Sequence, residues 1–322
     1  MIKAYKKKRL LLIMPFFMGY QKQLKNELQK KYDVTLINSD QYDKEIIERY
    51  LNCNKIGWGL RHISRLLLER DQENAMQPFF SQIISMVSCE KNYYQIVLCI
   101  NGAYIPNMFY SLLRKKNPNA RFIYYAWDDI HNLLKYSHIR LFEEKYSYNI
   151  NECKKYKMKY LPMFVQGVIE GHSDKDCYDL AYIASAHSDR LKIAEDLLQK
   201  YSYKYRLFIY LYDKDHRNMP YCKGEPLLYN EYIDIMRKSK AVLDIPHINQ
   251  NGPTTRPFDA LLTKTKVITT NKCLKDYPVY SENILVTDRD NFFIDEKFMN
   301  KPYVETKYRV LTISSWLDAM QL

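Results

Sequence analysis

The sequence predicts an α/β protein built from two doubly wound, Rossmann-like domains. Short, nearly continuous apolar runs alternate with amphipathic stretches along both halves of the chain. Such runs are typical of strands that are buried on both faces of a parallel sheet. A polar stretch without periodicity, residues 165–177, separates the alternation into two series and is interpreted as a linker. The 322 residues are also enough for two domains of ordinary size.

The first series, residues 1–164, is predicted to form the N-terminal domain. Its strands are expected at 9–17, 34–38, 95–100 and 121–127. Its helices, in which apolar residues recur at helical spacing, are expected over about 20–31, through most of 43–92, and from Pro106 to about Lys116.

The second series, residues 178–306, is predicted to form the C-terminal domain, and residues 307–322 a closing helix. Its strands are expected at 180–185, 205–212, 241–245, 266–271 and 283–288. Its helices are expected over about 188–200, 230–238 and 257–263. Two such domains joined by a linker are expected to face a cleft, because ligands of these sheets bind at the strand ends.

Composition excludes several classes of protein. Hydrophobic residues make up 47% of the chain, which is enough for a sizeable core, but no run approaches the roughly 18 apolar residues of a membrane span. The basic and then apolar start is interpreted as a buried strand, since it lacks the small-residue cleavage site of a signal peptide. The seven cysteines are scattered without a CxxC pair, which indicates a reducing, cytoplasmic location and no zinc site.

The formal net charge of +12 indicates an anionic partner. We expect no nucleic acid, because the lysines are dispersed and no nucleic-acid-binding signature occurs. A nucleotide substrate or an anionic membrane surface explains the charge equally well. Peripheral contact with the inner face of the cell membrane would use these basic residues: Lys6, Lys7, Lys8, Arg9, Arg61, Arg65 and Arg70. The alternative is that the lysines only keep the protein soluble.

The stretch 244–271 is the most informative part of the chain. A strand end, a polar loop, a short helix and a second strand follow one another, which is a βαβ unit. The loop therefore precedes a helix N-terminus, where free N–H groups attract anions. Thr254, Thr255 and Arg256 add hydroxyl donors and a guanidinium suited to phosphate, and Asp259 could accept hydrogen bonds from sugar hydroxyls. The alternative is a helix cap with a surface arginine.

Two further groups are predicted at strand ends that face the cleft. Arg190, in the loop that begins at Ser185, could meet the same phosphates, although this segment could equally be a helix cap. Asp128, after the strand at 121–127, is the candidate general base, and its alternative is a solvated helix start. The pair Asp128-Asp129 is not the D-x-D of a metal-bound diphosphate, so we expect no metal and no cofactor.

These motifs resemble bacterial polysaccharide-biosynthesis glycosyltransferases of the two-domain GT-B type, including relatives of the spore-maturation group. The segment YDLAYIASAHSDR at 178–190 is similar to the opening of their second domain, Y-D-L-x-F-I-G-S-x-H-x-x-R. The segment QNGPTTRPFDALLTKTKVITTN at 250–271 is similar to their nucleotide loop, Q-x-G-L-T-x-R-x-F-E, followed by K-x-I-T-T-N.

The resemblance implies a metal-independent glycosyltransferase that moves a sugar from a nucleotide-sugar donor to a surface polysaccharide or a lipid-linked, lipooligosaccharide acceptor. It implies these donor-binding residues: Ser185, His187, Arg190, Gln250, Gly252, Thr254, Thr255, Arg256 and Asp259. The chain departs from the pattern at Ala184, Pro253 and Asp259, where the family has glycine, leucine and glutamate. The alternative is a non-catalytic member that binds a nucleotide-sugar or a glycan within an assembly complex.

Overall fold

The computed structural model describes residues 7–39, 93–102, 105, 107–133, 137–167, 171–173, 177–215 and 217–322. The chain divides into two compact units that interleave along the sequence. Unit 1 contains Met1–Phe16, Leu28–Ala126 and Leu133–Tyr146. Unit 2 contains Phe17–Glu27, Trp127–Asn132 and Ser147–Leu322. Two short segments from the first part of the sequence, 17–27 and 127–132, therefore pack with the second part.

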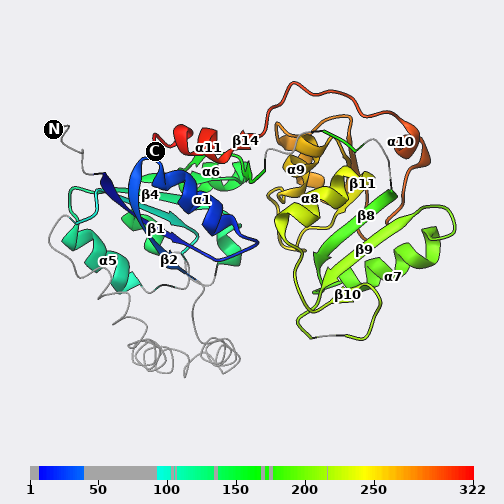
Figure 1. Cartoon of the computed structure of the whole chain (residues 1–322), viewed down its shortest axis with the longest axis horizontal. Coiled ribbons are helices and arrows are strands. Elements are labelled where there is room, and N and C mark those ends of the chain that lie inside the picture. The colour runs from blue at the N-terminus through cyan, green and yellow to red at the C-terminus, as the bar shows by residue number, and fades with distance from the viewer. Residues whose placement is uncertain are drawn as a thin grey trace, which may run out of the picture. The chain divides into compact units, whose positions relative to one another are not determined.

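The first sheet has six strands in the order β2-β1-β3-β4-β5-β6 (Figure 1). Their bounds are β1 Lys8–Met14, β2 Tyr32–Asn38, β3 Ile96–Ile100, β4 Arg121–Ala126, β5 Glu144–Ser147 and β6 Lys159–Tyr160. The pairings of β1 with β2, β1 with β3, and β3 with β4 are parallel. All five residues of β3 are buried, as expected for a strand covered on both faces.

Two helices of this part of the chain, α1 Tyr20–Gln29 and α5 Asn107–Lys116, lie where they were predicted. The α-helix α6 Ile150–Tyr156 and the 3-10 helices η1 Ile130–Asn132 and η2 Ser137–Leu141 were not predicted. Asn149 caps α6, accepting hydrogen bonds from the backbone N–H groups of Asn151 and Glu152. The helices predicted within 43–92 lie outside the described residues.

The second sheet has the order β10-β9-β8-β11-β12-β13, and every neighbouring pair is parallel. Its strands are β8 Tyr178–Ser185, β9 Leu207–Tyr212, β10 Cys222–Lys223, β11 Ser239–Asp244, β12 Lys266–Thr269 and β13 Ile284–Val286. In chain order this is 3-2-1-4-5-6, the order of dinucleotide-binding sheets. The strand order reverses between β8 and β11, so the carboxyl ends of these two strands form the switch point where such sheets bind ligands.

The helices of the second part follow its strands. They are α7 Arg190–Tyr201, α8 Tyr229–Arg237, α9 Arg256–Thr263, α10 Glu296–Asn300, α11 Ile313–Ala319 and the 3-10 helix η3 Lys272–Asp276. The short strand β14, Leu311–Thr312, leads into α11 and pairs with β7, Phe164–Val165. Trp316 on α11 is fully buried, with its ring centroid 4.8 Å from that of Phe164.

The predicted α/β class with two Rossmann-like sheets is confirmed. The closing helix is shorter than predicted, because residues 307–310 form neither helix nor strand, Leu311–Thr312 form β14, and α11 begins only at Ile313. Short elements such as β10 and α10 were not predicted, since two to five residues carry no measurable periodicity.

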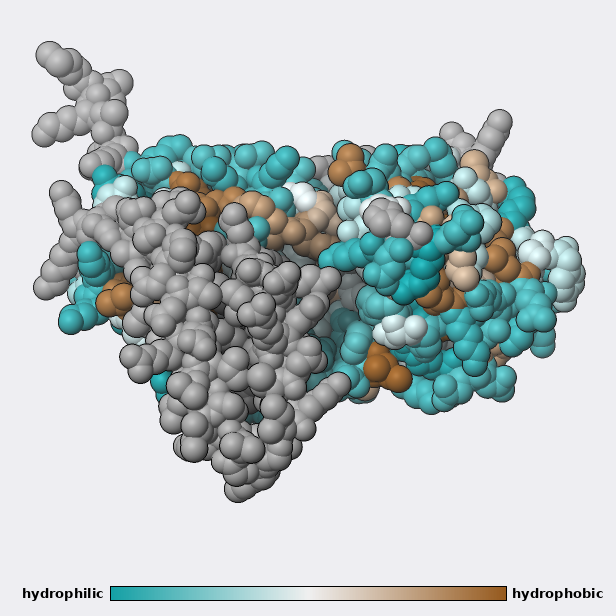
Figure 2. Space-filling model, turned by 90° about the horizontal axis from the view of Figure 1, so that it is seen from below, coloured by the Kyte–Doolittle hydropathy of each residue, from teal (hydrophilic) through white to brown (hydrophobic). Residues whose placement is uncertain are grey.

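Within the described residues, no helix is long and apolar enough to cross a membrane. Figure 2 shows a face on which hydrophilic residues dominate the described surface and hydrophobic residues form separate patches. Of the proposed membrane-binding residues, Lys6, Arg61, Arg65 and Arg70 lie outside the described residues. Lys7 donates to the backbone oxygen of Gln29 at 2.7 Å, and Arg9 lies 3.8 Å from the centroid of the Tyr93 ring.

Candidate functional site

The predicted donor-binding residues gather at the switch point of the second sheet. The loop after β8, residues 186–189, leads into α7, and residues 245–255, hereafter the β11–α9 loop, lead into α9. Because β8 and β11 are adjacent and parallel, both helices begin at the same edge of the sheet. Thr255, which precedes α9, makes no side-chain capping bond. The N–H of Arg256 instead donates to Thr254 Oγ1 at 3.2 Å, and those of Phe258 and Asp259 donate to the backbone oxygen of Thr255. Since Pro257 has no N–H, the first turn of α9 does not present the free N–H groups that were expected there for an anion.

Arg256, the first residue of α9, has its guanidinium inside this edge. It donates to Asp244 Oδ1 at 3.3 Å and to the backbone oxygen of Ile183 in β8, and its side chain is 15% exposed. The Nε atom is buried and has no hydrogen-bond partner. Desolvation is the largest influence and opposes its charge, but Asp244, together with Tyr232 and Tyr182, raises the pKa of Arg256. The predicted arginine is thus charged and largely buried.

Asp244, at the end of β11, accepts hydrogen bonds that fix the β11–α9 loop. This residue was not identified from the sequence. It is 0% exposed. Thr254 Oγ1 donates to its Oδ1 at 2.7 Å, and Thr269 Oγ1 donates to its Oδ2 at 2.9 Å. The hydroxyl of Thr254 is therefore committed to a carboxylate in this structure, rather than directed to solvent as expected for a phosphate ligand.

Arg190, at the start of α7, ties the two loops together. Its Nε and Nη2 atoms donate to the backbone oxygen of Ile245 at 3.1 and 2.7 Å, and Nη1 donates to that of Ser185 at 3.4 Å. Arg190 is 8% exposed. Burial, followed by the charge of Arg256, lowers the pKa of Arg190 to about 10. Two buried guanidinium groups therefore repel each other here, and a bound anion would relieve that repulsion.

Arg289 is a third arginine of this edge that sequence reasoning missed. It forms two hydrogen bonds of 2.7 Å with the carboxylate of Asp189 and donates to the backbone oxygen of Pro246 at 3.0 Å. Arg190, Arg256 and Arg289 all act to lower the pKa of the buried Tyr182 hydroxyl, although desolvation dominates and raises it. Arg256 and Arg289 are paired with Asp244 and Asp189, so the third guanidinium, that of Arg190, leaves these five groups with an excess of positive charge.

His187 lies at the surface of the loop after β8. Arg190 Nη1 donates to its Nε2 at 2.8 Å, and Ser188 Oγ lies 2.9 Å from its Nδ1. Desolvation and then the charge of Arg190 lower the pKa of His187 to about 4, so the ring is neutral at pH 7. Since Nε2 accepts from Arg190, the single proton of the neutral ring is on Nδ1, which is bonded to Ser188. In this structure the ring therefore adds no positive charge and has no further N–H for a ligand.

Asp259 differs from its predicted role. It was expected to contact sugar hydroxyls, but it is 1% exposed and its Oδ1 accepts from Tyr229 Oη at 2.7 Å. Burial raises the pKa of Asp259 to about 7, against the hydrogen bond from Tyr229. The side chain lies on the face of α9 that packs against α8, which directs it into the interior.

The middle of the β11–α9 loop is held from two sides. The backbone N–H of Gln250 donates to the oxygen of His247 at 2.9 Å, which closes a turn. Asn271, the last residue of the K-x-I-T-T-N motif, donates from Nδ2 to the oxygen of Gly252 at 3.0 Å. Asn251 N–H donates to Asp129 Oδ2 at 2.8 Å, and His131 Nε2 lies 2.8 Å from the oxygen of Asn249.

Asp128 and Asp129 have opposite environments. Asp128, the predicted base, is exposed, whereas Asp129 is 0% exposed. Both belong to the 127–132 segment of unit 2. The structure therefore leaves Asp128 accessible and gives Asp129 a part in holding the β11–α9 loop.

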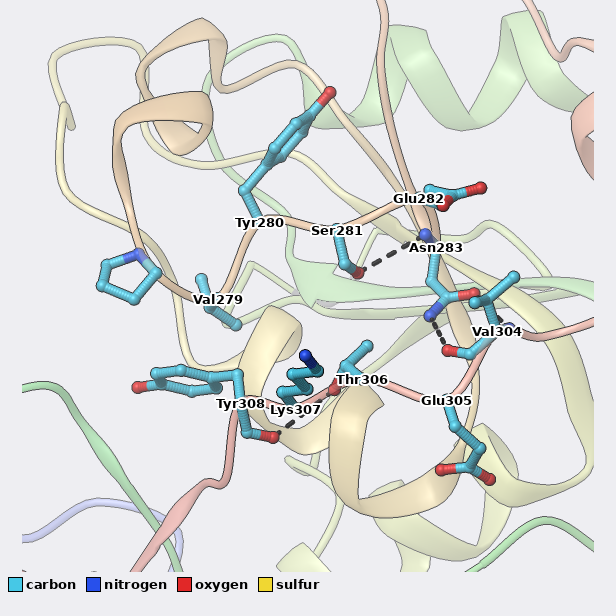
Figure 3. A pocket seen from close by; sticks show the side chains of 11 residues that line it. Val279, Tyr280, Ser281, Glu282, Asn283, Val304, Glu305, Thr306, Lys307 and Tyr308 are labelled. Atoms are coloured by element: carbon cyan, nitrogen blue, oxygen red, sulfur yellow. Dashed lines mark hydrogen bonds between the residues drawn. The ribbon is translucent and has the colours of Figure 1, made fainter.

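A surface pocket of about 350 Å³ lies elsewhere in unit 2 and is lined by residues 278–283 and 304–308 (Figure 3). Asn283 donates to the backbone oxygen of Val304 at 2.7 Å and accepts from its N–H at 2.9 Å, which holds the two walls together. Glu305 pairs with Lys264. None of the predicted site residues lines this pocket, and several of its polar groups are already paired.

Comparisons with known proteins do not identify a family for this chain. No protein-family model and no curated protein matches the chain. A similar solved structure is an alpha-glucosyltransferase in complex with UDP and a 13-mer DNA containing a HMU base, at 10% identity over 86% of this chain and 82% of that chain, with a TM-score of 0.47. Neither family nor activity follows from this.

A second similar structure is NAD+-bound 3-phosphoglycerate dehydrogenase from Entamoeba histolytica. It shares 12% identity over 92% of this chain and 84% of that chain, with a TM-score of 0.21. These comparisons do not support the expectation that nucleic acid is not a partner.

Proposed function

We propose that the protein is a GT-B-like glycosyltransferase that binds a nucleotide-sugar at the switch point of its second sheet. The observation that carries the proposal is a pair of arginines, the buried Arg190 and the largely buried Arg256, at the starts of two helices on one strand-end edge. Guanidinium groups favour a phosphate. The motif resemblance at 178–190 and 250–271 points to the same ligand.

The chemistry would be stabilisation of the leaving diphosphate. As the bond from the sugar to the diphosphate breaks, negative charge grows on the phosphate oxygens. Positive groups fixed in a low-dielectric site stabilise that charge more than water does. Arg190 and Arg256 are fixed by backbone oxygens of Ile245 and Ile183, so little reorganisation is needed when the charge develops.

The acceptor is proposed to be a surface polysaccharide or lipooligosaccharide, with Asp128 as the base that takes the proton of its hydroxyl. The exposure of Asp128 is compatible with that role. The reaction is proposed to need no metal, so EDTA should leave transfer intact. A requirement for manganese or magnesium that titration restores would contradict this part.

The rival function is a non-catalytic module that binds a nucleotide-sugar or a glycan. One observation favours it: the side-chain donors of Arg190 and Thr254 are occupied by protein groups. Turnover separates the two functions. A sugar nucleotide that binds but is neither hydrolysed nor transferred would favour the module.

The first experiment is a thermal-shift screen of the full chain with nucleoside diphosphates, sugar nucleotides and a DNA duplex. The proposal predicts that the melting temperature rises with one sugar nucleotide and with its nucleoside diphosphate. A rise with DNA alone would point to nucleic acid instead. Any hit is then incubated with candidate acceptors, and free nucleoside diphosphate is measured.

Location is tested separately by co-sedimentation with liposomes. Peripheral binding at the inner membrane face predicts recovery with anionic vesicles at low salt, loss by about 0.5 M salt through screening, and no recovery with neutral vesicles. Equal amounts in the supernatant with both vesicle types at low salt would contradict the membrane proposal.

A further inference from the structure

A buried carboxylate, Asp129, lies against the β11–α9 loop within unit 2. Its Oδ1 accepts hydrogen bonds from Tyr148 Oη at 2.6 Å and from Asn149 Nδ2 at 2.7 Å. Its Oδ2 accepts from the backbone N–H of Asn251 at 2.8 Å. With 0% of its surface exposed, Asp129 cannot be reached by a substrate in this structure. Its hydrogen bonds are short and charge-assisted, which makes them stronger than neutral ones.

The ring of Tyr148 supports the next residue of the loop. A Cβ atom added to Gly252 would lie 2.4 Å from Tyr148 Cε2 and 2.7 Å from its hydroxyl oxygen. No real side chain tolerates such approaches, so the backbone of Gly252 rests directly on the ring. This contact gives a physical reason for glycine at this place in the QNGPTTR segment.

The support beneath the loop is itself fixed. Glu152, which is 6% exposed, accepts from the N–H of Ile130 and from Ser147 Oγ, and so holds the segment that carries Asp129. Asn149 caps α6 and also accepts from Tyr277 Oη at 3.1 Å. Asp129 is therefore anchored independently of the loop that it holds.

We propose that Asp129 is a positioning residue for the nucleotide site. Through Asn251 and, by way of Tyr148, through Gly252, it fixes the segment that leads directly into Thr254, Thr255 and Arg256. The inference rests on the proposed function, because it assigns Asp129 the task of setting where the Arg256 guanidinium meets the diphosphate. Displacing such a group by about 1 Å can cost on the order of 100-fold in rate.

The first test replaces Asp129 by asparagine in the full chain. The new amide places a donor against either Asn251 N–H or Asn149 Nδ2, so one bond becomes a repulsion between two donors. Affinity for the nucleoside diphosphate found in the screen should fall by about 10-fold or more, as expected when a buried, charge-assisted bond is lost. Backbone hydrogen exchange in residues 247–256 should accelerate.

The second test restores the bonds by exchanging the two side chains. In Asp129→Asn/Asn149→Asp, the amide nitrogen at 129 donates to the carboxylate at 149, and the amide oxygen still accepts from Asn251. The second amide N–H faces Tyr148 Oη, which then accepts this hydrogen bond rather than donating it. The carboxylate at 149 can also still cap α6. This double variant should recover the parent's nucleotide affinity and exchange rates. A role limited to general stability gives no reason for such a specific rescue.

Asp276→Asn is the matched control, because Asp276 is exposed on η3 and undergoes the same chemical change. It should leave affinity and exchange unchanged. If Asp129→Asn does not fold, Tyr148→Phe replaces it, since it removes one hydroxyl and keeps the ring under Gly252. That variant should weaken nucleotide binding about threefold, less than Asp129→Asn, because Asp129 keeps its hydrogen bonds with Asn149 and Asn251.

The proposal is overturned if Asp129→Asn binds nucleotide and exchanges as the parent does, or if the double variant fails to rescue it. It is also overturned if Tyr148→Phe, used as the substitute, matches the parent. A parent protein that binds none of the nucleotides would instead defeat the proposed function. In that case the exchange measurements still decide whether Asp129 holds the loop.

Discussion

Two loops that follow buried strands keep their shapes by different means. The loop after β3 in unit 1 has left-handed backbone at Asn101 and Gly102, with φ of 57° and 62°. Neutral groups hold it: His138 Nε2 lies 2.7 Å from the oxygen of Asn101, and Tyr110 Oη donates to that of Gly102 at 2.7 Å. Burial lowers the pKa of His138 to about 4, which keeps the ring uncharged at pH 7.

The β11–α9 loop of unit 2 is held by charges instead. Asp244 and Asp129 are fully buried carboxylates, and Arg190 and Arg256 are guanidinium groups close enough to affect each other. Neutral hydrogen bonds suffice to fix a shape, whereas burying charge is costly. Our proposal is that the charged loop serves to meet a further charge, that of the diphosphate. The following predictions test that comparison.

The largest effect on transfer and on nucleotide binding is expected for Arg256→Ala. It should abolish transfer and weaken nucleoside diphosphate binding at least about 100-fold, as expected for truncating a buried charged partner. It should also lower the free energy of unfolding by about 3 kcal/mol, because Asp244 keeps a buried charge without its partner. Arg256→Lys should restore little affinity, since a point charge lacks the guanidinium fork. Calorimetry and urea unfolding measure both effects, and unchanged affinity in Arg256→Ala would remove this loop from the site.

Much of this comparison could be predicted from the sequence, and the missing parts have physical causes. Continuous apolar runs such as LLLI and IVLC predict buried parallel strands, and the TTR segment before a helix predicts an anion site. Arg289 gave no local signal, because its partner Asp189 is 100 residues away in the chain. Neighbouring acids cannot be told apart in a loop without periodicity, so the sequence pointed to Asp128 and overlooked the buried Asp129.

Asp259→Asn tests the pH dependence of unit 2. The pKa of Asp259 is about 7 in the folded protein against an ordinary value of 3.8, so the folded state binds the extra proton. Its contribution to stability is present below pH 3.8 and is lost as pH rises through 7. Asparagine imitates the protonated form and removes this loss. Relative to the parent, the variant should gain up to about 4 kcal/mol in unfolding free energy between pH 4 and pH 8.

Urea unfolding at a series of pH values measures that difference. If the unfolding free energies of the variant and the parent changed with pH in the same way across this range, Asp259 would not titrate near neutrality. It would also reopen the role first predicted for Asp259, an ionised contact to sugar hydroxyls.

His138→Gln tests the pH dependence of unit 1, where stability should change with pH in the opposite direction. The pKa of His138 falls from an ordinary 6.5 to about 4, so the unfolded state binds the proton first. The parent should therefore lose stability as pH falls from 6.5 to 4, by up to about 3 kcal/mol, and keep it above 6.5. The variant lacks this dependence, and the comparison again uses urea unfolding. Equal pH slopes in both proteins would mean that His138 is protonated in the fold.

The smallest effect is expected for Gly102→Ala, which strains the neutral loop. The added Cβ would lie 2.2 Å from Tyr110 Oη and 2.4 Å from Cys99 Sγ, at a φ of 62°. The left-handed backbone and the displaced neighbours together should cost about 2 kcal/mol in unfolding free energy. Nucleoside diphosphate affinity should not change, since this loop is fixed for shape. If Gly102→Ala lost nucleoside diphosphate affinity while its free energy of unfolding stayed unchanged, the loop after β3 would also take part in binding, which would contradict the distinction between the two loops.

The central claim, that the charged edge of the second sheet binds a diphosphate, is tested most directly by calorimetry on the full parent chain. Each nucleoside diphosphate of the screen is titrated beside its nucleoside at low and high salt. The account predicts that one diphosphate binds, that its nucleoside binds at least about 100-fold more weakly, and that salt weakens the diphosphate through screening. Equal binding of the nucleoside and its diphosphate, or no binding of any diphosphate to the folded parent, would contradict it.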